Sequence, residues 1–221
     1  MASTGSEKPC HHPGERLHQM DETDTAWRSF LDQPADYVVP EKLSACFDNR
    51  ISLAQCDLLL RSDRLRPRLS QRLIEHYELP SPAIDPAGEE DRAVALTPST
   101  RFGELILRSG AVFRANAIAG IIDKKHAIRL QTLLGDDVIA FALRNRELAA
   151  KNQPLDNIEL ALDEIVAEGW CCFHGWSMHA PDIVVARLKL KFAAEIPGRT
   201  HFNADHHELG AQIVRRVAIE L

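Results

Sequence analysis

Apolar residues recur at three- and four-residue spacings through most of the chain, which is the pattern of amphipathic helices. Leu65, Leu69 and Leu73 form one such stripe, with arginines at the other positions, and they predict a helix over residues 64–78. Shorter helices are predicted over residues 26–31 and 40–47. The first half of the chain is therefore predicted to hold several short helices.

The helical pattern strengthens after residue 100, beginning with Phe102, Leu105 and Ile106. Asp123 is placed to cap a following helix, because its carboxylate can accept hydrogen bonds from the first backbone N–H groups. Gly135 is placed to end that helix. Helices are also predicted from Asp136 and from Asp156, the second ending at Pro181, and after a capping box at Asp205 and Glu208.

One segment breaks this pattern, because apolar and basic residues alternate over 184–192. Leu188, Leu190 and Phe192 fall on one side and Arg187, Lys189 and Lys191 on the other, which is the period of a strand. The fold class predicted is therefore mainly α, a multi-helix globular domain with at most a short strand near the C-terminus, and a helix is the alternative for residues 184–192.

Breaks in the pattern divide the chain into four parts. Residues 1–22 are polar and are predicted to be a disordered tail. Residues 23–78 form an N-terminal helical segment, and residues 79–99, with four prolines and an acidic cluster, are predicted to be a linker or long loop. Residues 100–221 form the predicted helical core domain.

Composition and charge mainly argue against particular partners and locations. The net charge is −6, and the acidic excess lies in residues 1–100, which hold 11 Lys or Arg against 17 Asp or Glu. Nucleic acid is therefore an improbable partner. No apolar run approaches the length of a membrane span, and five cysteines with one adjacent pair suit a reducing compartment, so a cytoplasmic address without membrane insertion is expected.

A polar cluster near the C-terminus invites a metal interpretation. His201, Asp205 and His206 resemble part of the HxHxDH motif of metallo-β-lactamase-type hydrolases, but Asn203 stands where the second histidine belongs. Adjacent Cys171 and Cys172 point about 100° apart on a helix and suit one tetrahedral ion poorly. A metal-dependent hydrolase remains an alternative, but no metal ligand is assigned.

Motifs that carry catalysis or hold cofactors do not occur in the chain. It lacks the G-x-S-x-G elbow of serine hydrolases and both glycine-rich phosphate loops. We therefore predict no catalytic residue, no cofactor and no enzymatic activity.

Exposed charge is then the first place to look for function. The candidate interface residues are Arg64, Arg68 and Arg72 on one predicted helix and Arg215 and Arg216 near the C-terminus, because guanidinium groups pair well with carboxylates. Trp170, Phe173 and Trp176 could serve either as an interface anchor or as core residues.

The central part of the chain resembles a known family. Leu105 to Gly110, Ala117 to Ile122 and the leucine-rich segments that follow to Leu148 are similar to the central pattern of the SctK (YscK-like) family of type III secretion proteins. The aromatic segment 169–176 and the amphipathic C-terminal segment follow in the same order. The resemblance covers residues 100–221 best.

This resemblance implies a structural role. SctK-like proteins connect the cytoplasmic domain of the inner-membrane ring protein SctD to the SctQ pods, and through SctL to the secretion ATPase. The chain is accordingly expected to be a sorting-platform adaptor with SctQ-like and SctD-like partners, located in the cytoplasm at the inner membrane. A helical secretion regulator or chaperone is the alternative.

Overall fold

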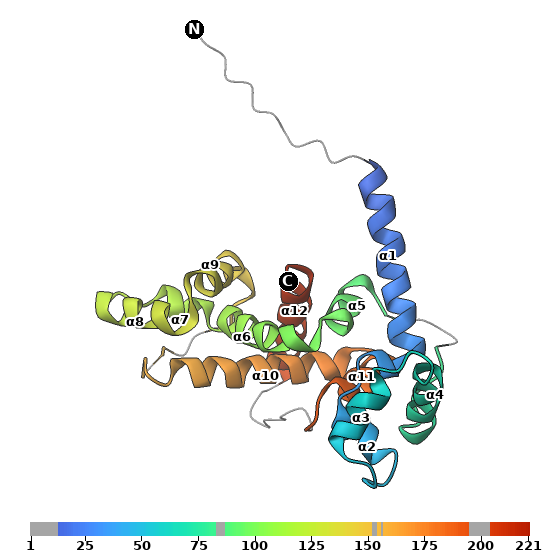
Figure 1. The fold of residues 1–221 in the computed structure, drawn as a ribbon. Coiled ribbons are helices and arrows are strands. Elements are labelled where there is room, and N and C mark those ends of the chain that lie inside the picture. The colour runs from blue at the N-terminus through green and yellow to red at the C-terminus, as the bar shows by residue number, and fades with distance from the viewer. Residues whose placement is uncertain (1–12, 83–86, 152–153, 156, 195–203) are drawn as a thin grey trace.

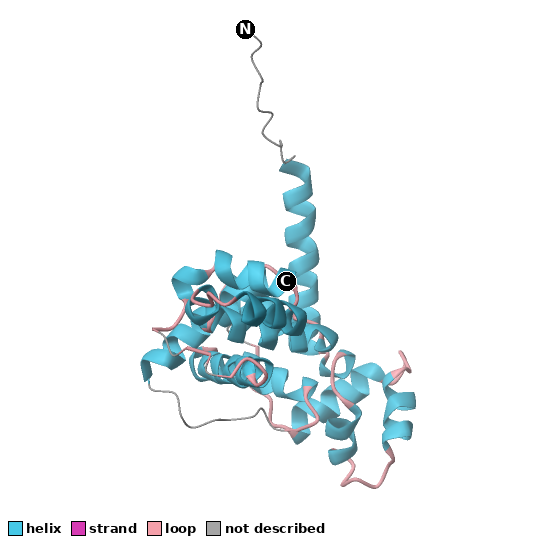
Figure 2. Ribbon diagram, turned by 90° about the vertical axis from the view of Figure 1, so that its left-hand side faces the viewer, coloured by secondary structure: helices cyan, strands magenta, loops and turns pink. Residues whose placement is uncertain are grey.

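A computed structural model describes residues 13–82, 87–151, 154–155, 157–194 and 204–221. Within these residues every regular element is a helix, so the mainly α fold class is confirmed (Figures 1 and 2). The helices are α1 (Pro13–Asp32), α2 (Pro40–Ala45), α3 (Leu53–Leu60), α4 (Arg66–His76), α5 (Glu89–Leu96), α6 (Phe102–Phe113), α7 (Ala115–Ala119), α8 (Lys124–Leu134), α9 (Asp136–Arg144), α10 (Ala161–His179), α11 (Asp182–Leu188) and α12 (Ala204–Ile219).

The centre of the fold is the long helix α10, which packs against both α6 and α12 (Figure 1). The α6–α10 crossing depends on two glycines. A Cβ atom added at Gly110 would lie 1.8 Å from the carbonyl oxygen of Ile165, and one added at Gly169 would lie 2.0 Å from that of Ile106. Only hydrogen at these two positions lets the backbones approach this closely.

Local sequence chemistry explains the boundaries of α8 and α9. The Asp123 carboxylate accepts a hydrogen bond from the backbone N–H of His126 at 2.9 Å, so the predicted cap is confirmed. Gly135 ends α8 at a φ of 85°, a backbone conformation that favours glycine. Asp136 and Asp137 then occupy the first turn of α9, where the helix dipole favours negative charge.

A second, smaller core lies beneath α2, α3 and α4. Helix α3 was not predicted, although its capping box was in the sequence: Ser52 Oγ accepts from the Gln55 backbone N–H, and the Gln55 side chain accepts from the Ser52 N–H. Each core also contains a residue from the other end of the chain: Leu190 belongs to the smaller core, and Trp27 belongs to the larger one. The division into a 23–78 segment and a 100–221 domain stays a prediction.

The segment predicted as a linker, residues 79–99, differs from that expectation. It contains α5, whose Val94 and Ala95 are fully buried in the larger core. The acidic cluster of Glu89, Glu90 and Asp91 is the first turn of this helix, where negative charge is favourable. The prolines lie before and after α5 and leave its interior free.

The first helix also begins earlier than expected. Residues 13–22, predicted as part of a disordered tail, form the first turns of α1, which projects from the rest of the molecule (Figure 1). Because adding a turn to an existing helix is much easier than nucleating one, α1 can extend outward from the packed turns at Trp27 and Phe30. Residues 1–12 lie outside the described residues.

Of the two alternatives for residues 184–192, the structure shows the helix and not the strand, since this segment forms the end of α11 and a 3₁₀ turn at Lys189–Lys191. The alternation does not separate an inner face from an outer one, because Arg187 and Lys191 are 1% and 7% exposed. Arg187 donates hydrogen bonds to the carbonyl oxygens of Leu31 at 2.8 Å and Pro80 at 2.9 Å. The buried guanidinium thus links α11 to the last turn of α1 and to the segment that follows α4.

Lys191 is buried in a similar way. Its Nζ donates to the carbonyl oxygens of Ala95 at 2.7 Å and Thr97 at 2.9 Å, and lies 5.4 Å from the ring centroids of Phe30 and Tyr37. Burial lowers the pKa of Lys191 to about 8. The folded chain therefore binds this proton less tightly than the unfolded chain does.

This difference predicts that the stability of the wild type rises with pH relative to a variant without Lys191. Between about pH 8 and about pH 9.5 the unfolded chain retains the Lys191 proton while the folded chain releases it, so the free energy of unfolding of the wild type should rise by about 2 kcal/mol relative to that of Lys191→Met. Urea titrations of both proteins across that window measure the difference, and a constant gap between them would contradict the prediction.

Candidate functional site

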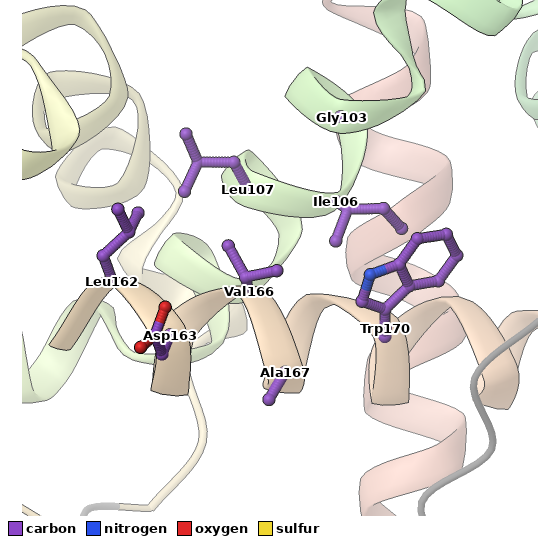
Figure 3. A pocket seen from close by; sticks show the side chains of 8 residues that line it. All are labelled: Gly103, Ile106, Leu107, Leu162, Asp163, Val166, Ala167 and Trp170. Carbon is purple, nitrogen blue, oxygen red and sulfur yellow. The ribbon is translucent and has the colours of Figure 1, made fainter. Parts of the chain in front are cut away.

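An apolar groove lies between α6 and α10, with a volume of about 560 Å³ (Figure 3). Helix α6 contributes Gly103, Ile106 and Leu107, and helix α10 contributes Leu162, Asp163, Val166, Ala167 and Trp170. The stretch from Leu162 to Trp170 spans about 12 Å, or roughly two helical turns, at the usual rise per residue. The groove is therefore long enough for a short helix of another chain.

The groove exists because of how the two helices meet. They touch at Gly110 and Gly169, whereas a Cβ added at Gly103, near the start of α6, would have nothing within 4 Å. Trp170 bounds one end of the groove (Figure 3) and is held by edge-to-face contacts, with ring centroids 5.9 Å from Phe173 and 6.1 Å from Phe192. It is a positioned, partly exposed aromatic residue.

The charge around the groove is acidic. Helix α10 carries Asp163, Glu164 and Glu168, and no lysine or arginine occurs between residues 152 and 186. Glu168 is paired with Arg114, whose Nε lies 2.6 Å from its Oε2, and burial raises the pKa of the Glu168 carboxyl. The Asp163 side chain is exposed and makes no hydrogen bond or ion pair with any residue that the structure describes. It is the charged residue of the groove lining.

The arginines predicted on α4 differ in what they contact. Arg64 lies just before the helix and Arg68 lies within it. Both side chains are exposed and make no hydrogen bond or ion pair within the described part of the chain. Arg72 is exposed too, but its Nη2 donates to the Cys46 carbonyl oxygen at 3.1 Å, so part of its donor capacity serves the fold. Arg64 and Arg68 thus remain available for a partner.

The C-terminal arginines lie in different environments. Arg215 forms a two-pronged ion pair with Asp91 of α5, with its Nε 2.7 Å from Oδ1 and its Nη2 3.2 Å from Oδ2. Trp176 Nε1 donates to the same Oδ1 at 2.8 Å. Arg215 therefore stabilises the contact between α5 and α12, whereas Arg216 is exposed.

The structure also places the aromatic residues and the polar cluster that the sequence analysis considered. Phe173, Trp176 and Cys172 are fully buried, so Cys172 packs as a small apolar residue. In the polar cluster considered as a metal site, His201 and the Asp205 side chain lie outside the described residues. His206 packs its ring edge-on against Phe113, with centroids 5.6 Å apart.

The groove was not predicted from the sequence. Two features of the sequence point to it in retrospect: Gly103 interrupts the packed face of an amphipathic helix, and the long stretch without lysine or arginine coincides with α10. No described helix is long and apolar enough to cross a bilayer. The arrangement supports recognition of a partner, through apolar contact and through the Asp163 carboxylate, which is unpaired among the described residues.

Comparison with known proteins identifies the family. A model of "YOP proteins translocation protein K (YscK)" matches residues 25–200. The chain is also 25% identical over 173 residues to the nodulation protein NolU of Rhizobium fredii, covering 75% of this chain and 76% of the relative. NolU of Sinorhizobium fredii (strain NBRC 101917 / NGR234) matches with the same identity and coverage. No solved structure matches the chain.

The family match extends well beyond the segment that carried the resemblance in the sequence. It begins in α1 and includes α2 to α5, the part of the chain where the sequence pattern was weakest. The resemblance to the SctK family is confirmed. The chain belongs to the YscK family and is a type III secretion system protein.

Proposed function

We propose that the chain is a non-catalytic structural adaptor that helps assemble the cytoplasmic sorting platform of a type III secretion system. It would link the inner-membrane ring, through an SctD-like cytoplasmic domain, to SctQ-like pods, and indirectly to SctL and the ATPase. The observation that carries this proposal is the match of the YscK family model over residues 25–200.

An adaptor needs at least two separate surfaces, and two candidates lie on different elements. The apolar groove lies between α6 and α10, while Arg64 and Arg68 lie at α4, toward one end of the molecule (Figure 1). One surface is apolar with an acidic residue, and the other is basic. Their chemistries suit two different partners, which supports a bridging role.

Co-purification tests this proposal most directly. The tagged full chain would be recovered from a secreting bacterium and the retained proteins identified by mass spectrometry. Recovery of SctQ-like, SctL-like or SctD-like proteins would support the adaptor role. Recovery of secreted effectors without these components would instead favour a regulator or chaperone, and stoichiometric metal in tag-free protein would favour a hydrolase.

The basic surface makes a separate prediction. The double variant Arg64→Glu/Arg68→Glu should fold normally, because neither side chain makes a polar contact within the described residues. It should reduce recovery of one platform component by about tenfold, since each reversed interfacial charge costs up to about 1 kcal/mol. Quantitative mass spectrometry of the retained proteins measures this loss.

The matched control is Lys151→Glu, which reverses an exposed charge in a loop away from α4. It should leave the recovery of every platform component unchanged. If the double variant retains all components at the level of Lys151→Glu, the α4 surface is not the basic contact, and the exposed Arg216 becomes the next candidate.

A further inference from the structure

We propose that the α6–α10 groove is the docking site for one amphipathic helix of a partner protein, with apolar residues on the inserted face and a lysine or arginine beside Asp163. The proposal rests on the adaptor role and deepens it, because it states the chemistry that one partner must present.

The dimensions of the groove select a helix. Two turns of a bound helix would place apolar side chains at positions i, i+4 and i+7 along the stretch between Leu162 and Trp170. Gly103 leaves the α6 wall open, so a large side chain of the partner can lie over the backbone there. Trp170 offers the aromatic contact that often dominates binding energy at such sites.

The acidic charge at the groove favours a partner helix with positive charge. Asp163 is exposed at the groove and unpaired within the described residues, and Glu164 beside it on α10 is unpaired there too. The remaining carboxylates of this region are engaged: Glu159 binds Arg129 at 2.5 Å, and Glu168 binds Arg114. Because α10 carries no lysine or arginine, a basic helix is attracted to the α10 wall of the groove.

A second copy of this chain is the main rival occupant. Helix α8 and the residue before its cap expose Ile122 and Ile128 next to Lys124 and Lys125, so this region is itself basic and apolar. Docking α8 of one copy into the groove of another would be a head-to-tail contact, which propagates into rings or filaments unless it closes. That arrangement predicts association that grows with protein concentration.

The test uses purified full-length protein and two synthetic helical peptides. Both carry leucine at the i, i+4 and i+7 positions, one with lysine flanking them and the other with glutamate. Trp27 and Trp176 are buried, so acrylamide quenching of tryptophan fluorescence reports chiefly on Trp170. The lysine peptide should protect Trp170 with half-saturation below about 100 µM, and the glutamate peptide should bind at least about threefold more weakly.

Three variants give the test its specificity. Gly103→Leu places an aliphatic side chain in the groove where nothing lies within 4 Å, so this variant should fold normally. Its affinity for the lysine peptide should fall at least about tenfold. Gly103→Ala adds only a methyl group at the same position and should change binding by less than about twofold. Asp163→Lys should reverse the preference, so that the glutamate peptide binds more tightly.

Several outcomes would overturn the proposal. These are no protection of Trp170 by either peptide up to about 1 mM, equal binding of the two peptides, or full binding to Gly103→Leu. Light scattering that finds a concentration-dependent assembly of the wild type, abolished by Gly103→Leu, would assign the groove to a second copy instead.

Failure of the groove proposal is distinguishable from failure of the adaptor role. If the wild type recovers platform components from the cell but the peptides do not bind, the adaptor role stands and the groove is not its docking site. If the peptides bind as expected but no platform component is recovered, the groove recognises a basic helix and the adaptor role fails.

Discussion

Replacing Gly110 with alanine should lower the free energy of unfolding by about 3 kcal/mol, because the new methyl group has nowhere to go. Its Cβ would lie 1.8 Å from the Ile165 carbonyl oxygen and 2.9 Å from the Gly169 nitrogen. These are backbone atoms of α10, which cannot rotate away as a side chain can. The two helices would have to separate along the crossing that centres the fold, and urea unfolding monitored by circular dichroism would measure the cost.

The matched control lies in the same helix. Gly103→Ala meets nothing within 4 Å and should raise the free energy of unfolding by up to about 1 kcal/mol, since alanine favours the helical backbone. Opposite signs for one substitution at two positions of α6 would establish that the close approach, and not helix propensity, decides the outcome at Gly110. Similar effects at both positions would contradict the crossing as described.

Local signals in the sequence predicted those parts of the fold that depend on local chemistry. Asp123 accepts the predicted capping bond, Gly135 ends α8, and Pro181 follows the end of α10. Each of these depends on a residue and its neighbours within one turn. The missed helix α3 was open to the same reasoning, because Ser52 and Gln55 form a capping box that the sequence already spelled out.

Features that depend on distant residues could not be obtained this way. The basic residues at 187 and 191 suggested an exposed strand face, yet their acceptors are carbonyl groups of Leu31, Pro80, Ala95 and Thr97, which no local pattern reveals. The same holds for the groove, which requires knowing that α6 and α10 meet at Gly110 and Gly169 and that Gly103 faces open space.

Arg215 shows how this limit affects a site prediction. Charge density and terminal position made it a candidate interface residue, but its partner Asp91 lies 124 positions away, in a segment that the prolines made look like a linker. The ion pair that engages Arg215 is also what attaches α5 to α12. The interface candidates that remain exposed and unpaired in the described residues are Arg64, Arg68 and Arg216.

Asp91→Ala should lower the free energy of unfolding by about 4 kcal/mol, the usual cost of removing one partner from a largely buried ion pair. The Asp91 side chain is 11% exposed and accepts from both Arg215 and Trp176. Its loss leaves the fully buried Trp176 Nε1–H without its acceptor and the Arg215 guanidinium without its counter-ion. Urea unfolding of the purified variant measures the effect.

Two comparisons separate this ion pair from a general effect of charge. Asp24→Ala removes the 3.3 Å pair between α1 and Arg92 of α5, which is more exposed, and should cost less than about 1 kcal/mol. The double variant Asp91→Ala/Arg215→Met should lower the free energy of unfolding by less than the sum of the two single variants, because it no longer buries an unpaired cation. If Asp91→Ala instead costs no more than Asp24→Ala, α5 would contribute little to the core and would behave as the linker that its flanking prolines suggest.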